Sequence, residues 1–284
     1  MQIEHLETFL NLLETSSFNA TADNLGLTQS TVSSRVKVLE ESIGKKLFIR
    51  SRAGTRPTAA GLRLADHARS VLHEWNAARR SVQRVDNFNQ SMRIGLQSDL
   101  AASHIGNWVS EFRQALPDTA LYVELDYSTQ MCADLLAGQM DVAVLFSPRY
   151  MPDLYYENVG EVRYRMVSTC APTLTDIPSA SYIFGNYSSV IERAHQQQLP
   201  GFNNAPITSG QNAAVQNLLT TLGGSAFVLE ETADDLVRTN HCYLVDDVEA
   251  IRQPVYLGVH LRRRHQGAHK KLLKIVKRHF SPLA

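Results

Sequence analysis

The sequence contains no apolar run long enough to cross a membrane. No stretch of the 284 residues approaches the ~18 uninterrupted apolar residues of a spanning helix. The first ten residues, MQIEHLETFL, carry two Glu where a signal peptide would carry Lys or Arg. We therefore expect a cytoplasmic protein.

Cysteine is scarce as well. The three cysteines, Cys132, Cys170 and Cys242, are odd in number and far apart, and they lack the spacing of metal ligands. This pattern argues against a disulfide framework and against a zinc site, so we expect reduced and mostly buried thiols.

Enzyme signatures are also missing. The sequence contains no G-x-S-x-G, no H-E-x-x-H and no Walker loop, and its ten His are scattered. Asp99 and Asp141 would be a candidate carboxylate pair, but each has a simpler structural role. We expect no catalysis and no cofactor or metal.

Charge is segregated along the chain although the formal net charge is zero. Residues 35–63 hold eight Lys or Arg against Glu40 and Glu41, a net charge of +6, which favours contact with phosphates. Residues 95–251 hold six basic and nineteen acidic side chains. Residues 252–284 hold nine Lys or Arg and no acid, which indicates either a second DNA patch or, our preferred interpretation, a solvated helix face.

The first 58 residues predict a winged helix-turn-helix. Apolar residues at three- and four-residue steps predict helices over 3–13, 19–25 and 29–43, with Gly26 in the turn and Thr28 as a cap. Residues 47–58 read as two short extended pieces around a Gly turn, which is typical of a wing.

The third predicted helix presents hydroxyl, amide and cationic groups, the types that reach base edges and phosphates. An ordinary solvated helix face would carry more Glu. The predicted DNA-binding residues of this helix and of the wing are Gln29, Ser30, Thr31, Ser33, Ser34, Arg35, Lys37, Arg50, Arg52 and Arg56.

Beyond the wing, the sequence predicts a long helix and then a second domain. The helical period continues from Ala59 to about Val85, and a helix of this length beside a DNA-binding module is a candidate for dimerisation, with Trp75 as a packing anchor. Polar residues then mark a break. We expect a DNA-binding domain over 1–58, a linker helix over 59–86, a hinge over 87–91 and an effector domain over 92–284.

The effector domain alternates strands with helices, which predicts an open parallel sheet and two α/β lobes. The lobes are expected over about 92–161 with 262–284, and over about 162–261. The overall class is α+β, with a C-terminal domain like the two-lobed periplasmic binding proteins. A periplasmic binding protein itself would have a signal peptide and no helix-turn-helix.

Together these residues resemble the LysR-type transcriptional regulators, and the resemblance covers the whole chain. It is strongest in the run Ser17–Ala22, in Thr28-Gln29-Ser30, in Leu47-Phe48 and in Thr58–Gly61, with weaker matches at Ile94-Gly95 and Leu222-Gly223-Gly224. Thr21, Pro57 and Glu230 depart from the residues common in that family, without touching the DNA-binding assignment.

The resemblance implies a transcription regulator that acts as a homo-oligomer, usually a homotetramer built as a dimer of dimers. Its paired recognition helices would read a two-fold-related operator in double-stranded DNA. A small-molecule effector would bind between the lobes, and RNA polymerase is a further candidate partner.

Ligands of open parallel sheets sit beyond the carboxyl ends of the strands, near helix N-termini. Asp99 is unusual there, because a carboxylate facing the cleft would disfavour a simple carboxylate ligand and tolerate an amine or a hydroxyl. Mapping the predicted strand ends selects the effector-binding candidates Gln97, Ser98, Asp99, Leu100, Ser128, Thr129, Gln130, Phe146, Ser147, Asn186, Tyr187, Ser209 and Gln211.

Two alternatives remain open at this stage. Cys132 begins a predicted helix whose dipole would lower the thiol pKa, and several methionines, among them Met131 and Met140, could be oxidised, so an oxidant-sensing regulator is a rival. A sequence-blind DNA-binding protein is the second alternative, and weak discrimination between operator and random DNA would support it.

Overall fold

The computed structural model describes residues 2–51, 54–82, 88 and 90–280, which form two compact units. The first unit comprises residues 1–85 with the short segment 136–139, and the second comprises 86–135 and 140–284. None of the described helices is both long enough and apolar enough to cross a membrane.

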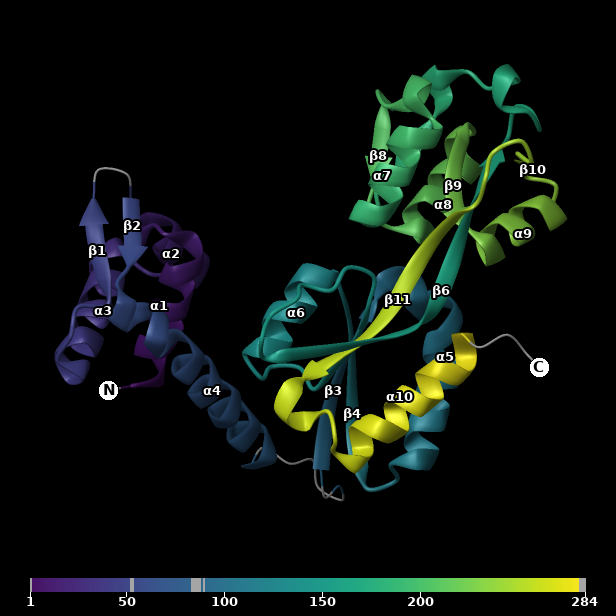
Figure 1. Ribbon diagram of the computed structural model, residues 1–284. Helices are drawn as coiled ribbons and strands as arrows, with labels where there is room; N and C mark the ends of the chain where they lie inside the picture. The colour runs from purple at the N-terminus through teal and green to yellow at the C-terminus, as the bar shows by residue number, and fades with distance from the viewer. Residues whose placement is uncertain (1, 52–53, 83–87, 89, 281–284) are drawn as a thin grey trace. The chain divides into compact units, whose positions relative to one another are not determined.

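The first unit is a three-helix bundle followed by a hairpin and a long helix (Figure 1). Ser17 and Thr28 cap the second and third helices by accepting hydrogen bonds from the backbone amides of Ala20 and Thr31, as their sequence positions predict. Gly44 ends the third helix at φ 70°, a conformation that favours glycine. The elements are α1 (Ile3–Thr15), α2 (Phe18–Leu25), α3 (Gln29–Ile43), β1 (Phe48–Ser51), β2 (Gly54–Pro57) and α4 (Ala59–Val82).

The core of this unit fixes the orientation of α3. Leu6 and Phe9 of α1 pack with Val36 and Leu39 of α3, and the Phe9 ring lies 5.5 Å from the ring of Phe48 at the start of the wing. Because one apolar face of α3 is buried in this way, several of its polar side chains, among them Ser30, Ser34 and Lys37, are left exposed.

The second unit is a mixed α/β domain with two lobes. Its N-terminal elements are β3 (Gln90–Gln97), α5 (Ser98–Ala115), β4 (Thr119–Asp126), α6 (Ser128–Leu136), β5 (Val142–Leu145) and β6 (Leu154–Ser168). The remaining strands and α-helices are β7 (Ile183–Gly185), α7 (Ser189–Gln198), β8 (Ile207–Ser209), α8 (Asn212–Leu222), β9 (Ser225–Leu229), α9 (Glu230–Arg238), β10 (Tyr243–Leu244), β11 (Ile251–His260) and α10 (Gly267–Phe280).

The sheet of this unit is mixed, so the prediction of an open parallel sheet was wrong in part. Strands β3, β4 and β5 pair in parallel, as do β7 and β8. However, β11 runs antiparallel to both β5 and β6, and β9 and β10 run antiparallel to β6. The order of the main sheet is β10-β6-β11-β5-β3-β4, with β9 also paired to β6.

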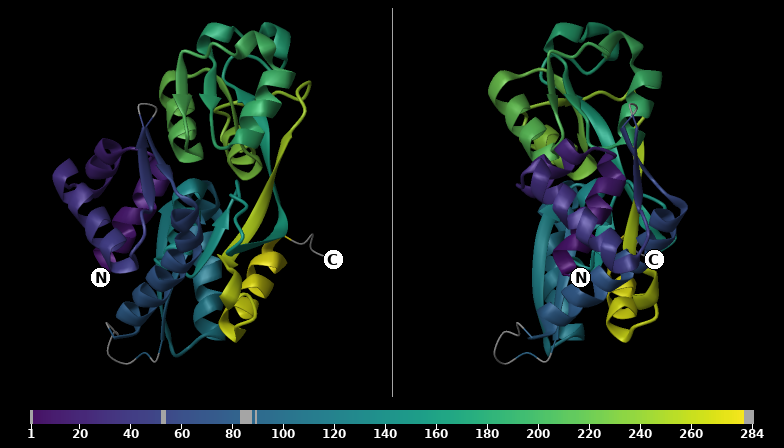
Figure 2. Two further views of the ribbon diagram at one scale, coloured as in Figure 1. Left: turned by 60° about the vertical axis from the view of Figure 1, so that its left-hand side comes forward. Right: turned by 90° about the vertical axis from the view of Figure 1, so that its left-hand side faces the viewer.

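Two long strands, β6 and β11, connect the lobes (Figures 1 and 2). We call the lobe with β3–β5, α5, α6 and α10 lobe I, and the lobe with β7–β9 and α7–α9 lobe II. The two strands are antiparallel and each spans both lobes, with β6 entering lobe II and β11 returning to lobe I. Their register shifts between Val255 and Tyr256. The predicted lobe boundaries near 161 and 261 therefore fall within β6 and just after β11.

Candidate DNA-binding surface and ligand-binding cleft

The N-terminal half of α3 presents polar side chains to solvent. Gln29, Ser30, Ser34 and Lys37 are exposed, while Ser33 is half-buried. Ser30, Ser34, Lys37 and Glu41 follow one another at steps of four, three and four residues, so they form a single row along the helix. This row combines hydroxyl groups with one cation and is acidic only at its far end.

Several of the predicted DNA-binding residues make contacts within the unit. The hydroxyls of Ser30 and Thr31 lie 2.9 Å and 2.8 Å from the Thr28 hydroxyl at the start of the helix. Arg35 is half-buried, and its guanidinium donates to the Thr8 hydroxyl of α1 at 3.3 Å. Lys37 pairs with Glu41 at 3.7 Å, with both side chains mostly exposed, and such a pair contributes little stability.

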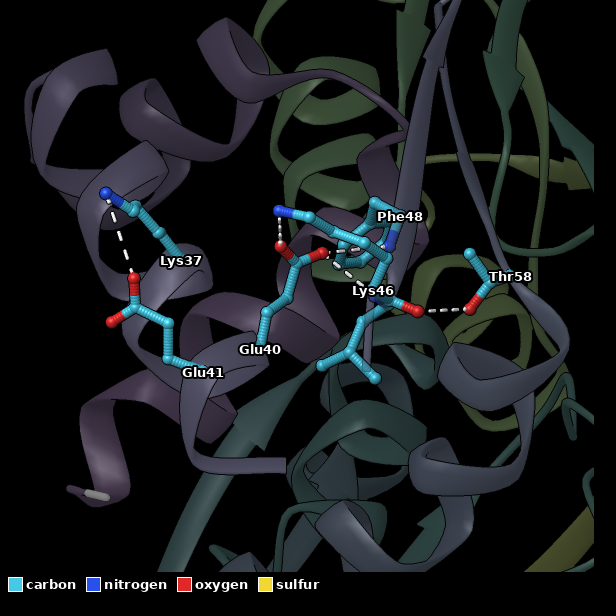
Figure 3. A network of polar contacts seen from close by, with 7 residues as sticks. Lys37, Glu40, Glu41, Lys46, Phe48 and Thr58 are labelled. Carbon is cyan, nitrogen blue, oxygen red and sulfur yellow. Dashed lines mark hydrogen bonds and ion pairs between the residues drawn. The ribbon is translucent and has the colours of Figure 1, made fainter. Parts of the chain in front are cut away.

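A buried carboxylate joins the wing to α3 (Figure 3). Glu40 accepts hydrogen bonds from the backbone amides of Leu47 at 2.8 Å and Phe48 at 3.3 Å, and from the Lys46 ammonium at 2.6 Å. Burial alone would raise the pKa of Glu40, but the bonds from Lys46 and the two amides outweigh it and hold that pKa below its ordinary value. The backbone at the start of the wing is thereby fixed to α3.

The wing itself is described in part. β1 and β2 pair antiparallel from Phe48 opposite Pro57 to Ser51 opposite Gly54. Arg56 is exposed on β2. Arg52 and the side chain of Arg50 lie outside the described residues, so their contacts stay predictions.

In the second unit, Asp99 links three elements. It is only 4 % exposed at the start of α5, and its carboxylate accepts from the Tyr164 hydroxyl of β6 at 2.8 Å and from the Asn212 amide at the start of α8 at 2.9 Å. Burial raises the pKa of Asp99 above its ordinary value, although both hydrogen bonds act in the opposite direction. A lobe I carboxylate thus occupies the N-terminus of a lobe II helix.

A second polar chain crosses from lobe I to lobe II. The Ser128 hydroxyl donates to the Gln97 side chain at 3.0 Å and accepts from the backbone amides of Phe146 and Ser147. Gln253 of β11 donates to the Phe146 carbonyl and accepts from Ser188, which caps α7. Four of the predicted cleft residues therefore lie together in one hydrogen-bonded network.

The predicted lobe II residues occupy different environments. Tyr187 is buried, its ring stacks on Tyr164 with centroids 4.7 Å apart, and its hydroxyl donates to the Phe227 carbonyl. Asn186 and Gln211 are exposed and Ser209 is half-buried.

The other lobe I candidates are less closely tied to the network. Leu100 is buried in the core, Ser98 is half-buried, and Thr129 and Gln130 are exposed, with Gln130 donating to Asp134.

Sequence reasoning missed four residues of the two networks: Tyr164, Ser188, Asn212 and Gln253. Ser188 and Asn212 stand at helix starts, a signal that was readable from the sequence. Tyr164 and Gln253 lie inside the crossing strands β6 and β11, and the sequence offers no signal that their side chains meet the cleft.

The candidate redox residues are buried. Cys132 is 1 % exposed and accepts a hydrogen bond from the Tyr156 hydroxyl, and Met131 and Met140 are fully buried. Cys170 is the exposed cysteine. Burial of the Cys132 sulfur counts against direct oxidation, and the oxidant-sensing alternative stays an untested prediction.

A winged helix-turn-helix followed by a two-lobed domain defines a DNA-binding transcription regulator with an effector-binding domain. Residues 3–62 match the family model described as the bacterial regulatory helix-turn-helix protein, lysR family. Residues 86–281 match the LysR substrate binding domain. The chain belongs to the LysR-type transcriptional regulators.

Similar proteins match this chain over nearly their full length. The HTH-type transcriptional regulator HdfR of Yersinia pestis is 27 % identical, with 96 % of each chain covered. LysG of Corynebacterium glutamicum, solved with the bound effector Arg, has a TM-score of 0.56 at 18 % identity, with 98 % of this chain and 97 % of that chain covered. DarR of Vibrio fischeri, solved in complex with DNA, has a TM-score of 0.55 at 19 % identity and 98 % coverage of both chains.

Proposed function

We propose that this regulator reads a two-fold-related operator with the exposed N-terminal half of α3, and that a small molecule bound between lobes I and II alters its DNA binding. The observation that carries the first part is the outward row of two hydroxyl groups and one cation on α3, with the exposed amide of Gln29 at the start of the helix. Groups of this kind at the start of a recognition helix reach base edges in the major groove.

Within this surface the residues divide into two roles. Gln29, Ser30 and Ser34 are exposed and short enough to read bases, and Ser33 lies beside them. Lys37 and the wing residue Arg56 are exposed cations suited to phosphate contact. Thr31 and Arg35 are half-buried, and they contribute by holding the helix in place through their contacts with Thr28 and Thr8.

A footprint on the intergenic DNA upstream of the protein's own gene tests this proposal. The wild type is expected to protect a two-fold-related site and to prefer it strongly over random DNA. A Ser30→Ala/Ser34→Ala variant is expected to lose roughly tenfold or more of that preference. Ser189→Ala, an exposed serine on α7, is the matched control and should leave the footprint unchanged. Equal binding to operator and random DNA by the wild type would instead support a sequence-blind binder.

The second part of the proposal concerns the ligand class. Asp99 already places a carboxylate at the N-terminus of α8, where an anionic ligand would otherwise bind. A ligand beside Asp99 is therefore expected to bring an amine or hydroxyl donor. That the similar LysG carries Arg as its effector is in keeping with such a ligand.

Thermal-shift screening of full-length protein with amino acids, amines and hydroxy acids tests the ligand class. Amine- or hydroxyl-bearing compounds are expected to raise the melting temperature, and Asp99→Ala is expected to weaken the best of them. Asp118→Ala, an exposed loop carboxylate, is the control. Unchanged affinity in Asp99→Ala would remove Asp99 from the site.

We further propose that the protein acts as a homo-oligomer assembled through α4. Trp75 and Val82 are 48 % and 83 % exposed, and Val71 lies on the same face of the helix. An exposed apolar row of this kind on a long helix fits pairing with a second copy.

A further inference from the structure

Lobe I contains a cavity of about 370 Å³ that shares no residue with the cleft networks. Its lining residues come from the lobe I ends of β6 and β11, from the loop that follows β11 and from the first half of α10. Its volume falls within the range of small-molecule sites. We call it the α10 cavity.

The α10 cavity has an apolar lining and a basic edge. Leu257 and Val259 of β11, Leu273 of α10 and the ring of Tyr155 supply the apolar surface. Three exposed basic residues, Arg264, His265 and Lys270, stand at its edge. The Arg264 guanidinium carbon lies 5.6 Å from the centroid of the Tyr155 ring, so a cation borders the aromatic surface.

The only acidic residue in this lining is Glu157, and a cation outside the lining compensates its charge. Its carboxylate pairs with the Lys277 ammonium and also accepts a hydrogen bond from the Tyr155 hydroxyl at 3.5 Å. The charge left to face the cavity is therefore positive, which favours an anionic ligand group at the edge.

A buried histidine is an independent indication of a polar ligand group. His269 is 3 % exposed and lines the cavity. Burial lowers the pKa of His269 and the charge of Arg263 lowers it further, which outweighs the charge of Asp141 and a hydrogen bond from the ring to the Asp141 backbone, so the ring is neutral. One ring nitrogen is engaged by that hydrogen bond, and the other remains an acceptor with no partner of ordinary geometry among the described residues.

From these features we propose that the α10 cavity is a second ligand site, which binds a small aromatic carboxylate carrying a hydroxyl group. The aromatic ring lies against Tyr155 and the aliphatic side chains, and the carboxylate meets Arg264 and Lys270 at the edge. The hydroxyl donates to the His269 nitrogen that the Asp141 backbone does not engage, which satisfies a buried acceptor.

Isothermal titration of the full-length protein with three related compounds tests the proposal. 4-Hydroxyphenylacetate should bind saturably, at concentrations below roughly 10 mM. Its neutral amide should bind at least roughly tenfold more weakly, because the basic edge loses the carboxylate. 4-Methylphenylacetate, which replaces the hydroxyl by a methyl group, should bind several-fold more weakly because the remaining His269 acceptor then lacks a donor.

Variants then locate the binding to this cavity. Arg264→Glu/Lys270→Glu should abolish the preference for the acid over the amide, whereas Arg113→Glu/Lys274→Glu, an equal charge change at exposed sites outside the lining, should keep it. His269→Phe should abolish the preference for hydroxyl over methyl.

Three results would overturn the proposal. The first is the absence of saturable binding, and the second is an equal loss of preference in the two charge-reversal variants, which would indicate general electrostatics. The third is an unchanged preference in Arg264→Glu/Lys270→Glu, which would place the probe in another site such as the cleft. The surface double variant keeps the test decisive even if His269→Phe fails to fold.

Discussion

Glu40 and Asp99 are both buried carboxylates, but their surroundings shift their pKa values in opposite directions. The Glu40 carboxylate accepts hydrogen bonds from an ammonium and two backbone amides, which lower its pKa. Asp99 receives a hydroxyl and one amide and has no ion-pair partner among the described residues, so burial dominates and its pKa rises. The number and charge of the donors therefore decide which form of each carboxyl the folded state favours.

Glu40→Gln is expected to destabilise the DNA-binding unit by roughly 1–2 kcal/mol at pH 7, because the charged acceptor of two buried amides is lost. The folded pKa of Glu40 is lowered, so its contribution is present above the ordinary value of 4.5 and is lost as pH falls through the lowered value. Hydrogen exchange at the Leu47 and Phe48 amides should show the effect at pH 7 and a smaller one near pH 4. Glu41→Gln, at an exposed carboxylate, should leave these amides protected.

For Asp99 we expect the opposite pH dependence of the free energy of unfolding. Its folded pKa is raised, so the wild type loses stability relative to a neutral side chain as pH rises from the ordinary value of 3.8 through the raised one. Asp99→Asn keeps an acceptor for the Asn212 amide and a donor for the Tyr164 oxygen. In thermal unfolding, the melting temperature of Asp99→Asn relative to that of the wild type should therefore rise between pH 3.5 and 7.

Asp99→Ala provides the comparison for this test. It leaves the Asn212 amide and the Tyr164 hydroxyl without their partner and should cost roughly 1–3 kcal/mol at every pH. If Asp99→Asn loses as much stability as Asp99→Ala at pH 7, charge rather than hydrogen bonding holds the lobes together at this point.

At the scale of elements, α4 has exposed apolar residues on two opposite faces. Val71, Trp75 and Val82 lie on one face, whereas Leu62, which is 60 % exposed, lies nine residues before Val71 and hence on the opposite face. Trp75→Glu/Val82→Glu is expected to shift the protein toward monomer in sedimentation velocity, and Leu62→Glu should not. A monomeric wild type, or equal dissociation by both variants, would contradict assembly through this face.

The elements of the first unit could be predicted because their signals are local. Ser17, Thr28 and Gly44 mark helix ends within a few residues of the apolar stripes that they bound, and the structure has caps at those positions. The antiparallel pairing of β6 with β11 could not be predicted, since it joins segments about ninety residues apart. The apolar pattern gives the strands but carries no information on which strands pair.

The same distinction applies to the cleft. Gln97 and Ser128 were predicted because they follow strand ends, and the structure brings them within hydrogen-bonding distance. Tyr164 and Gln253 reach the networks only because β6 and β11 pass between the lobes, and this depends on the unpredicted pairing. Local signals located the network residues at strand ends, and the topology brings in Tyr164 and Gln253.

Over the whole molecule, the basic C-terminal stretch compensates the acidic middle of the chain. Arg263 pairs with Asp141, Lys277 with Glu157 and Arg278 with Glu111, all within the second unit. The preferred interpretation of this stretch as a solvated face was therefore incomplete, because several of its cations are ion-pair partners. Cations paired with these mostly buried carboxylates are poor candidates for a second DNA patch, whereas Arg56 of the first unit is exposed and the partner of Lys37 is itself mostly exposed.

The salt dependence of operator binding tests this division of charge. Each phosphate contact contributes about one unit to the slope of log affinity against log salt, because counterions are released from the DNA. Lys37→Gln and Arg56→Gln are each expected to lower the slope by about one unit, while Lys277→Gln/Arg278→Gln should leave it unchanged. A slope lowered by the C-terminal variant would mean that these cations leave Glu157 and Glu111 to meet DNA, and the basic stretch would then be a second DNA-binding surface.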